Sequence, residues 1–165
     1  MIQWEDSMQA ITFTTPGGPE VLHVAPAPDP TPTAEQVVVR VRATALNRAD
    51  TLQRRGLYPP PPGESDILGL ELAGEVESIG AAVTGIMPGD RVCGLVGGGG
   101  YAEKAVLDAR MAIPIPTGWS FVQAAAVPEV FFTAQETLFT LGNLQKGETV
   151  LIHAAASGVG TAGIQ

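Results

Sequence analysis

Apolar and polar side chains alternate with a period of two over residues 36–43. Val37 and Val39 fall on one face of an extended chain, whereas Arg40 and Arg42 fall on the opposite face. This alternation is typical of a strand that buries one face. We therefore expect a half-buried β-strand over this stretch.

Short apolar stretches separated by turn-forming residues predict more strands. The 20 glycines and 14 prolines fall in clusters between these stretches rather than as a repeat. The cluster at 16–19 predicts a hairpin connection, and residues 26–32 predict a stiff connector. The four prolines at 59–62 predict a rigid exposed loop, because proline has no backbone donor. The further strands are expected over residues 9–14, 21–25, 71–79, 91–96 and 101–107.

Helical spacing replaces the alternation in three places. Residues 47–55 predict a short helix, with Asn47 as its cap and Gly56 as its stop. A capping-box pattern begins a second helix over 120–126. Apolar residues at helical spacing over 131–141 predict a third and longer helix.

A glycine motif follows residues 149–155, which are apolar on both faces and so predict a buried strand of a parallel sheet. The motif has the dinucleotide-binding spacing Gly158-x-Gly160-x-x-Gly163. Gly158 permits a sharp turn, Gly160 lets backbone amides approach a pyrophosphate, and Gly163 permits close packing of helix on strand. The helix N-terminus would then favour the anion. A glycine-rich turn without a ligand is the alternative.

The sequence ends two residues after this motif. A dinucleotide fold needs further strands, and the residue that reads the ribose normally lies about 20 residues downstream. We therefore expect the 165 residues to be the front part of a longer protein.

Composition and charge exclude several classes of protein. Asp and Glu outnumber Lys and Arg by 17 to 9, for a formal charge of -8, so the basic surface of a nucleic-acid-binding protein is missing. Cys93 is the one cysteine, which excludes an internal disulfide and a four-cysteine zinc site. The sequence has neither a secretory signal nor an apolar run of about 18 residues. We expect a cytoplasmic protein with no nucleic-acid or membrane partner.

Six motifs occur in the order typical of one family. They are ALNRAD at 45–50, LYPPPPG at 57–63, ILGLELAG at 67–74, PGDRV at 88–92, GGYAE at 99–103 and AAASGVG at 154–160. Through them the sequence resembles the medium-chain dehydrogenase/reductases, and more closely their zinc-free NADPH:quinone oxidoreductase (zeta-crystallin-like) branch. The resemblance covers nearly everything from Met8 to Gln165.

This resemblance implies two domains. Residues 1–128 would form a GroES-like β-barrel catalytic domain, with 1–7 as an extension. Residues 129–165 would be the linking helix and the first strand and turn of a Rossmann domain that binds NADPH. Relatives associate through the edge of the Rossmann sheet, so we expect a homodimer for the full-length protein.

Residue types at the zinc-ligand positions of this family argue against a metal. Zinc-dependent members have Cys where this chain has Asn47 and His where it has Leu70, and leucine cannot be a ligand. The region of the third ligand offers only Glu129. We expect no metal and therefore no zinc-dependent alcohol dehydrogenase mechanism.

The resemblance also implies the site residues. Asn47 would lie near the nicotinamide, Asp50 would support it, and Tyr58 would border the substrate cleft. Each has a structural alternative, because Asn47 and Asp50 suit a helix N-terminus and Tyr58 can pack against its prolines. The coenzyme-binding residues would be Asn47, Thr133, Ser157, Gly158, Val159, Gly160 and Gly163. For Thr133, a hydrogen bond within its own helix is the alternative.

Other reactive residue types have simpler interpretations. We expect Glu71 to have a structural partner such as an arginine, His153 to be a hydrogen-bonded core residue, and His23 to lie on a surface strand. Cys93 is expected to be a buried thiol. The run 97–100 is either a flexible lip of the cleft or a long turn.

Three functions remain open. The first is hydride transfer from NADPH to a quinone, which accepts hydride without a Lewis acid. The second is reduction of an activated carbon–carbon double bond, as in the alkenal and enoyl reductases of the same superfamily. The third is a non-catalytic GroES-like module, which applies if the natural chain is this short.

Overall fold

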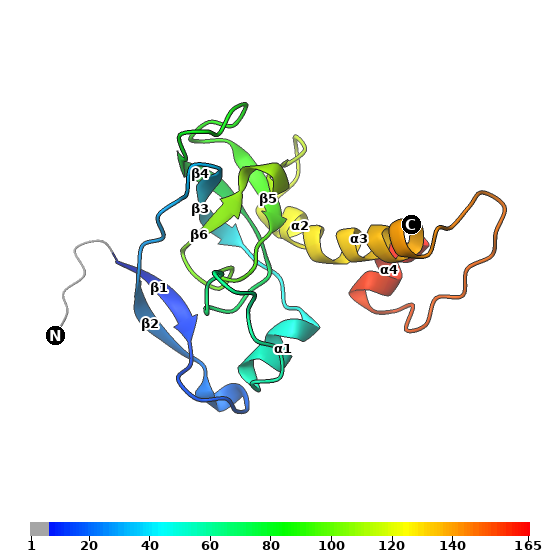
Figure 1. Ribbon diagram of the computed structural model, residues 1–165, viewed down its shortest axis with the longest axis horizontal. Helices are drawn as coiled ribbons and strands as arrows, with labels where there is room; N and C mark the ends of the chain where they lie inside the picture. The colour runs from blue at the N-terminus through cyan, green and yellow to red at the C-terminus, as the bar shows by residue number, and fades with distance from the viewer. Residues whose placement is uncertain (1–6) are drawn as a thin grey trace.

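The computed structural model describes residues 7–165 of the protein, and Figure 1 shows two sheets with a pair of helices projecting to one side. Residues 1–6 of the expected N-terminal extension lie outside the described residues. Ser7, its last residue, begins the first strand.

The main sheet has five antiparallel strands in the order β6-β3-β4-β5-β7. They are β3 (Gln36–Ala43), β4 (Glu71–Ile79), β5 (Arg91–Leu95), β6 (Lys104–Asp108) and β7 (Ile113–Pro114). Val37 and Val39 are fully buried, while Arg40 and Arg42 are exposed, as the alternation predicted; Val38, on the face of the arginines, is buried as well. The predicted strands at 71–79 and 91–96 are confirmed, whereas β6 begins three residues later than expected and the short β7 was not predicted.

A separate hairpin pairs β1 (Ser7–Thr12) with β2 (His23–Pro28) in antiparallel register. The predicted turn cluster at 16–19 lies between them, and the short helix η1 (Pro19–Val21) begins at its last residue, so that β2 starts two residues later than expected. β2 extends into the expected connector, since Pro26 and Pro28 are accommodated at a sheet edge. A single bridge between Ala10 and Ala102 joins the hairpin to the chain just before β6.

All three predicted helices form. The helix α1 (Arg48–Arg54) lies between the expected cap Asn47 and Gly56, whose φ is +74°. The capping box begins α2 (Phe121–Ala125), and α3 (Pro128–Gln135) continues as the π-helix η3 (Glu136–Leu141). The glycine motif forms α4 (Gly158–Ile164), which packs against α3. A further short helix, η2 (Ala109–Met111), precedes β7.

The predicted buried strand at 149–155 is wrong. These residues form an extended stretch and a turn, and most of them are exposed. A strand requires a neighbour for its hydrogen bonds, and within residues 7–165 no segment pairs with this one. His153 is exposed as a result, so its predicted place in the core is also wrong.

The glycine run at 97–100 is a packed turn rather than a flexible lip. Gly98 to Gly100 are buried, and the Gly99 and Gly100 amides donate to the carbonyls of Ile67 and Gly69 at 2.7 and 3.0 Å. The proline loop at 59–62 is mostly exposed, as predicted. None of the helices in residues 7–165 has the length and apolar character needed to cross a membrane.

The core is built from side chains that project from the strands of the main sheet. Its largest cluster of buried residues comprises Val37, Val39, Leu72, Val76, Val92, Ala105 and Leu107. A second cluster joins α2 to the sheet through Ala124, Ala125 and Cys93. The predicted burial of Cys93 is confirmed, and burial raises the pKa of its thiol. His23 is exposed on β2, as predicted.

Truncating Leu72 should destabilise the protein strongly, because its side chain is fully buried at the centre of the largest cluster. We expect L72A to lower the free energy of unfolding by about 3 kcal/mol, through lost burial and an unfilled cavity. Leu141 is 73% exposed and provides the matched control, for which L141A should change stability by less than about 0.5 kcal/mol. Urea unfolding of both variants measures this, and equal losses would contradict the assigned core.

Candidate active site

The candidate site begins at the N-terminus of α1. Asn47 is the residue before the helix, and Asp50 lies in its first turn. The Asn47 backbone amide donates to Oδ2 of Asp50 at 2.7 Å. Asp50 is only 4% exposed, so this carboxylate is held inside the protein and not at the surface of the helix. Asn47 lies at the N-cap position, as predicted, and the Asp50 carboxylate accepts from its backbone amide, but the Asn47 side chain makes no capping hydrogen bond.

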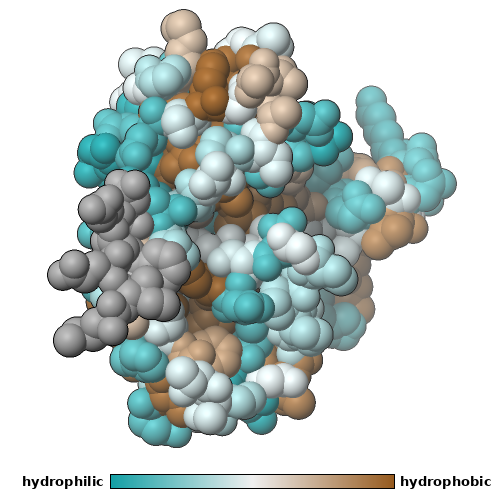
Figure 2. All heavy atoms as spheres, turned by 60° about the vertical axis from the view of Figure 1, so that its left-hand side comes forward, coloured by the Kyte–Doolittle hydropathy of each residue, from teal (hydrophilic) through white to brown (hydrophobic). Residues whose placement is uncertain are grey.

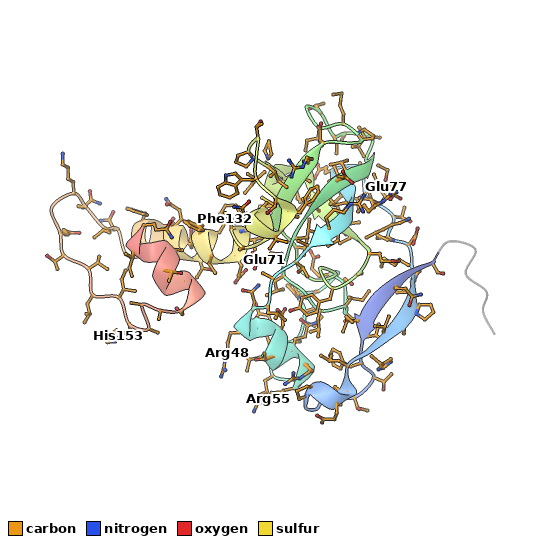
Figure 3. All side chains as sticks on the ribbon, turned by 180° about the vertical axis from the view of Figure 1, so that it is seen from behind. Arg48, Arg55, Glu71, Glu77, Phe132 and His153 are labelled. Carbon is orange, nitrogen blue, oxygen red and sulfur yellow. The ribbon has the colours of Figure 1, made fainter. Side chains whose placement is uncertain are left out.

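Glu71, the first residue of β4, connects two helices. Its side chain is buried, and each carboxylate oxygen accepts one hydrogen bond. Nδ2 of Asn47 donates to Oε1 at 2.7 Å, and the backbone amide of Glu129 donates to Oε2 at 2.9 Å. Figure 3 shows Glu71 between α1, which carries Arg48, and α3, which carries Phe132. The carboxylate therefore links the start of α1 to the start of α3.

The expected arginine partner of Glu71 is a wrong prediction. Arg40 pairs with Glu77 at 2.9 Å, and Arg42 pairs with Glu75 at 2.7 Å, both on the exposed side of the sheet. Glu71 faces inward at the start of β4, and its carboxylate accepts from two N–H groups rather than pairing with a cation. Burial raises the pKa of Glu71 and the nearby Asp50 raises it further, while the bonds from Glu129 and Asn47 act in the opposite direction.

Tyr101 completes this network and was not predicted from the sequence. Its hydroxyl donates to Oδ2 of Asp50 at 2.7 Å, so this one oxygen accepts from both Tyr101 and Asn47. Burial and the acceptor Asp50 raise the pKa of Tyr101, which therefore stays a neutral donor. The other Asp50 oxygen, Oδ1, is buried without a hydrogen-bond partner. The sequence placed Tyr101 in the motif GGYAE and at the start of an expected strand, but nothing in it indicated a contact with Asp50.

Glu129 adds a third carboxyl group to the same region. It lies half-buried in the first turn of α3, one residue after Pro128. Burial raises the pKa of its carboxyl, and the negative charges of Glu71 and Asp50 raise it further. The site thus gathers three acids near the amide of Asn47, and each additional negative charge there is unfavourable.

Two predicted site residues lie outside this network. Thr133 is on α3, one turn beyond Glu129, and lines a hollow of about 590 Å³ together with Phe132 and Leu95. Tyr58 is 42% exposed on the loop after α1, and within residues 7–165 its hydroxyl has no hydrogen bond. The contacts expected of both with coenzyme or substrate stay predictions.

The glycine motif forms the start of α4. Oγ of Ser157 accepts from the Gly160 amide at 3.0 Å and caps the helix. A Cβ at Gly160 would lie 2.5 Å from the Ala154 carbonyl oxygen, and one at Gly158 would lie 2.8 Å from the Val130 side chain. Close packing alone therefore requires both glycines. Val159 is exposed beside them, and the site they would offer to a pyrophosphate stays a prediction.

An open, mainly apolar groove of about 700 Å³ lies between the hairpin and the main sheet. Figure 2 looks at the molecule from nearer the hairpin side and shows apolar atoms at the bottom of hollows on this face. Tyr101 and Leu46 belong to its wall, so the groove adjoins the hydrogen-bond network. Leu46 is 89% exposed, immediately before Asn47.

The side chains at this site do not suit a catalytic zinc ion. Leu70 offers no donor atom, and both oxygens of Glu71 are already engaged by N–H groups. Among residues 7–165, no group of three or more His, Cys, Asp or Glu is arranged to hold a metal ion. The expected independence from zinc stays a prediction.

Comparison with known proteins identifies the family. The model of the alcohol dehydrogenase GroES-like domain matches residues 33–117, and the chain belongs to this family. It is therefore a member of the medium-chain dehydrogenase/reductase superfamily. The fold expected from the resemblance is confirmed at this level.

Relatives of two kinds are similar to the chain. It is 43% identical over 161 residues to the pikromycin polyketide synthase component PikAII of Streptomyces venezuelae, covering 98% of this chain and 4% of that protein. It is 46% identical over 151 residues to a quinone oxidoreductase of Pseudomonas aeruginosa, covering 91% of this chain and 46% of that protein. The chain thus spans less than half the length of these relatives.

Two solved structures are also similar to the chain. The CurK enoyl reductase matches with a TM-score of 0.87 and 34% identity, over 96% of this chain and 50% of that one. The mycobacterial protein Rv1454c, solved with NADPH, matches with a TM-score of 0.83 and 35% identity, over 95% of this chain and 48% of that one.

Neutralising Glu129 should change how stability depends on pH. Because the pKa of Glu129 is raised in the folded protein, the folded state binds this proton more tightly than the unfolded state does. Stability is then lost as the pH rises from about 4.5, the ordinary value, through the raised one. We expect E129Q to stabilise the protein at pH 8 relative to its effect at pH 4. Urea unfolding at both pH values measures the difference, and an identical effect at each would contradict the carboxyl cluster.

Proposed function

We propose that the complete protein is a zinc-independent oxidoreductase that transfers hydride from NADPH to a quinone. The observation that carries the proposal is the side-chain amide of Asn47, fixed by Glu71 at 2.7 Å beside the start of α3. An uncharged amide held in this way suits the positioning of a planar nicotinamide and does not suit a Lewis acid. The quinone oxidoreductase of Pseudomonas aeruginosa and the NADPH complex of Rv1454c support the choice of acceptor and coenzyme.

The role proposed for each residue combines the family resemblance with the position of the residue in the fold. Asn47 and Thr133 hold the carboxamide and ring of the nicotinamide, from α1 and α3 respectively. The backbone amides of the turn into α4 receive the pyrophosphate, and the residues that form this site are Ser157, Gly158, Val159, Gly160 and Gly163. Tyr58 borders the quinone from its exposed loop and donates to a quinone oxygen.

The chemistry needs little from the protein beyond this positioning. NADPH, when bound, supplies the hydride, and a quinone is electron-poor enough to accept it directly. Addition of one hydride and one solvent proton converts the quinone to a hydroquinone and leaves NADP⁺. Asn47 and Tyr58 act by orienting the two rings and by donating hydrogen bonds. Orientation is demanding, because displacing a reacting group by 1 Å lowers the rate by up to about 100-fold.

Reduction of an activated carbon–carbon double bond is the second candidate. It is favoured by the similarity to PikAII and to the CurK enoyl reductase, and it uses the same hydride donor. The full-length protein is proposed to act in the cytoplasm as a homodimer, with a small electrophile as its only other partner.

Activity of the complete protein separates these candidates. We expect oxidation of NADPH by 1,4-benzoquinone to exceed its oxidation by a crotonyl thioester, and N47A to lower kcat for the quinone about tenfold through lost orientation. N143G is the control, because Asn143 lies in the exposed turn after η3 with a φ of +48°, which glycine adopts freely. Turnover of the thioester alone would establish the second candidate, and no turnover of either acceptor would exclude both.

A further inference from the structure

We infer that Tyr101 is a positioning residue for hydride transfer, acting through Asp50 on Asn47; this inference rests on the function proposed above. The hydroxyl of Tyr101 bonds to Asp50 and not to the side chain of Asn47. The link is Oδ2 of Asp50, which accepts the Tyr101 hydroxyl and the Asn47 backbone amide, each at 2.7 Å.

The network restrains Asn47 at two points. Asp50 holds the backbone amide, and Glu71 holds Nδ2 of the side chain at 2.7 Å. Two restraints on one residue fix both its position and the direction of its amide group. The restraint through Glu71 acts on the side chain alone, whereas Asp50 holds the backbone through its carboxylate and through its amide, which donates to the Asn47 carbonyl at 3.2 Å.

The orientation of the Asp50 carboxylate depends in turn on Tyr101. The Asp50 side chain is 4% exposed, and its Oδ1 has no hydrogen-bond partner. The hydroxyl of Tyr101 is therefore one of few donors that orient this buried carboxylate. Without it, the carboxylate keeps the Asn47 amide but gains freedom to rotate toward a better-solvated position, because a buried charge with too few donors is unfavourable. Such a rotation would carry the start of α1 with it.

Tyr101 itself is held firmly by the main chain around it. Its amide donates to the Leu68 carbonyl at 2.9 Å, and its carbonyl accepts from the Ile11 amide at 2.9 Å. Gly69, with a φ of +100°, lies against it, and a Cβ there would lie 2.6 Å from the Tyr101 ring. Tyr101 is thus held in place between β1 and the segment before β4, which fixes the position of its hydroxyl group.

Kinetics of the complete protein test whether Tyr101 acts through Asn47. In a single turnover with 1,4-benzoquinone, Y101F should slow NADPH oxidation about threefold to tenfold, the effect of one lost hydrogen bond. In an N47A background the same change should cost less than about twofold, because the group that it positions is gone. T12V is the matched control: it deletes a hydroxyl that lies 3.3 Å from the His23 ring on the exposed hairpin, and it should leave the rate unchanged. Equal slowing in both backgrounds would mean a general structural role and would overturn the inference.

Two NMR measurements decide the geometry independently of activity. Exchange of the Asn47 amide with solvent should be faster in Y101F than in the unmodified protein and unchanged in T12V. In the unmodified protein, a nuclear Overhauser effect should connect the Tyr101 hydroxyl proton with the Asn47 amide proton. This second measurement needs no variant, so it still tests the inference if Y101F does not fold. Unchanged exchange or a missing effect would overturn the inference. If the unmodified protein does not reduce quinones, the proposed function fails, while these measurements still decide whether Tyr101 holds Asn47.

Discussion

The buried carboxylate of Glu71 is the interaction on which the site depends. Removing a carboxylate from water is costly, and the cost is offset here by two N–H donors at 2.7 and 2.9 Å rather than by a cation. Each donor comes from a different helix start, one from Asn47 before α1 and one from Glu129 in α3. Loss of either donor would leave a buried charge with one free oxygen. The carboxylate therefore fixes the sheet, α1 and α3 relative to one another.

The main sheet delivers the parts of this network to one place. Glu71 is the first residue of β4 and pairs with Leu95, the last residue of β5, so it lies at one end of the sheet. The packed turn at 97–100 follows and returns the chain past the Glu71 carbonyl to Tyr101. α1 fills the connection between β3 and β4, which brings Asp50 to the same end. The connection 44–70 between β3 and β4 and the connection 96–103 between β5 and β6 thus meet at this end, which places residues far apart in sequence within hydrogen-bond distance.

Local signals predicted most of the fold and only part of the site. The alternation over β3 and the cap and stop of α1 depend on neighbours in sequence, and they were correct. The strand predicted at 149–155 was wrong because a strand depends on partners that local apolar character cannot supply. Asn47 was found through its motif, whereas the partners of Glu71 lie 24 and 58 residues away, and Tyr101 is 51 residues from Asp50. No periodicity records such pairs, so only the folded chain reveals them.

A crystal structure of the complete protein with NADPH tests most directly whether this arrangement forms a hydride-transfer site. We expect the nicotinamide ring against Asn47 and Thr133, the pyrophosphate at the turn from Ser157 to Gly160, and the Glu71 bonds to Asn47 and Glu129 intact. A nicotinamide placed away from Asn47, or a metal ion coordinated by Asn47 and Glu129, would contradict it.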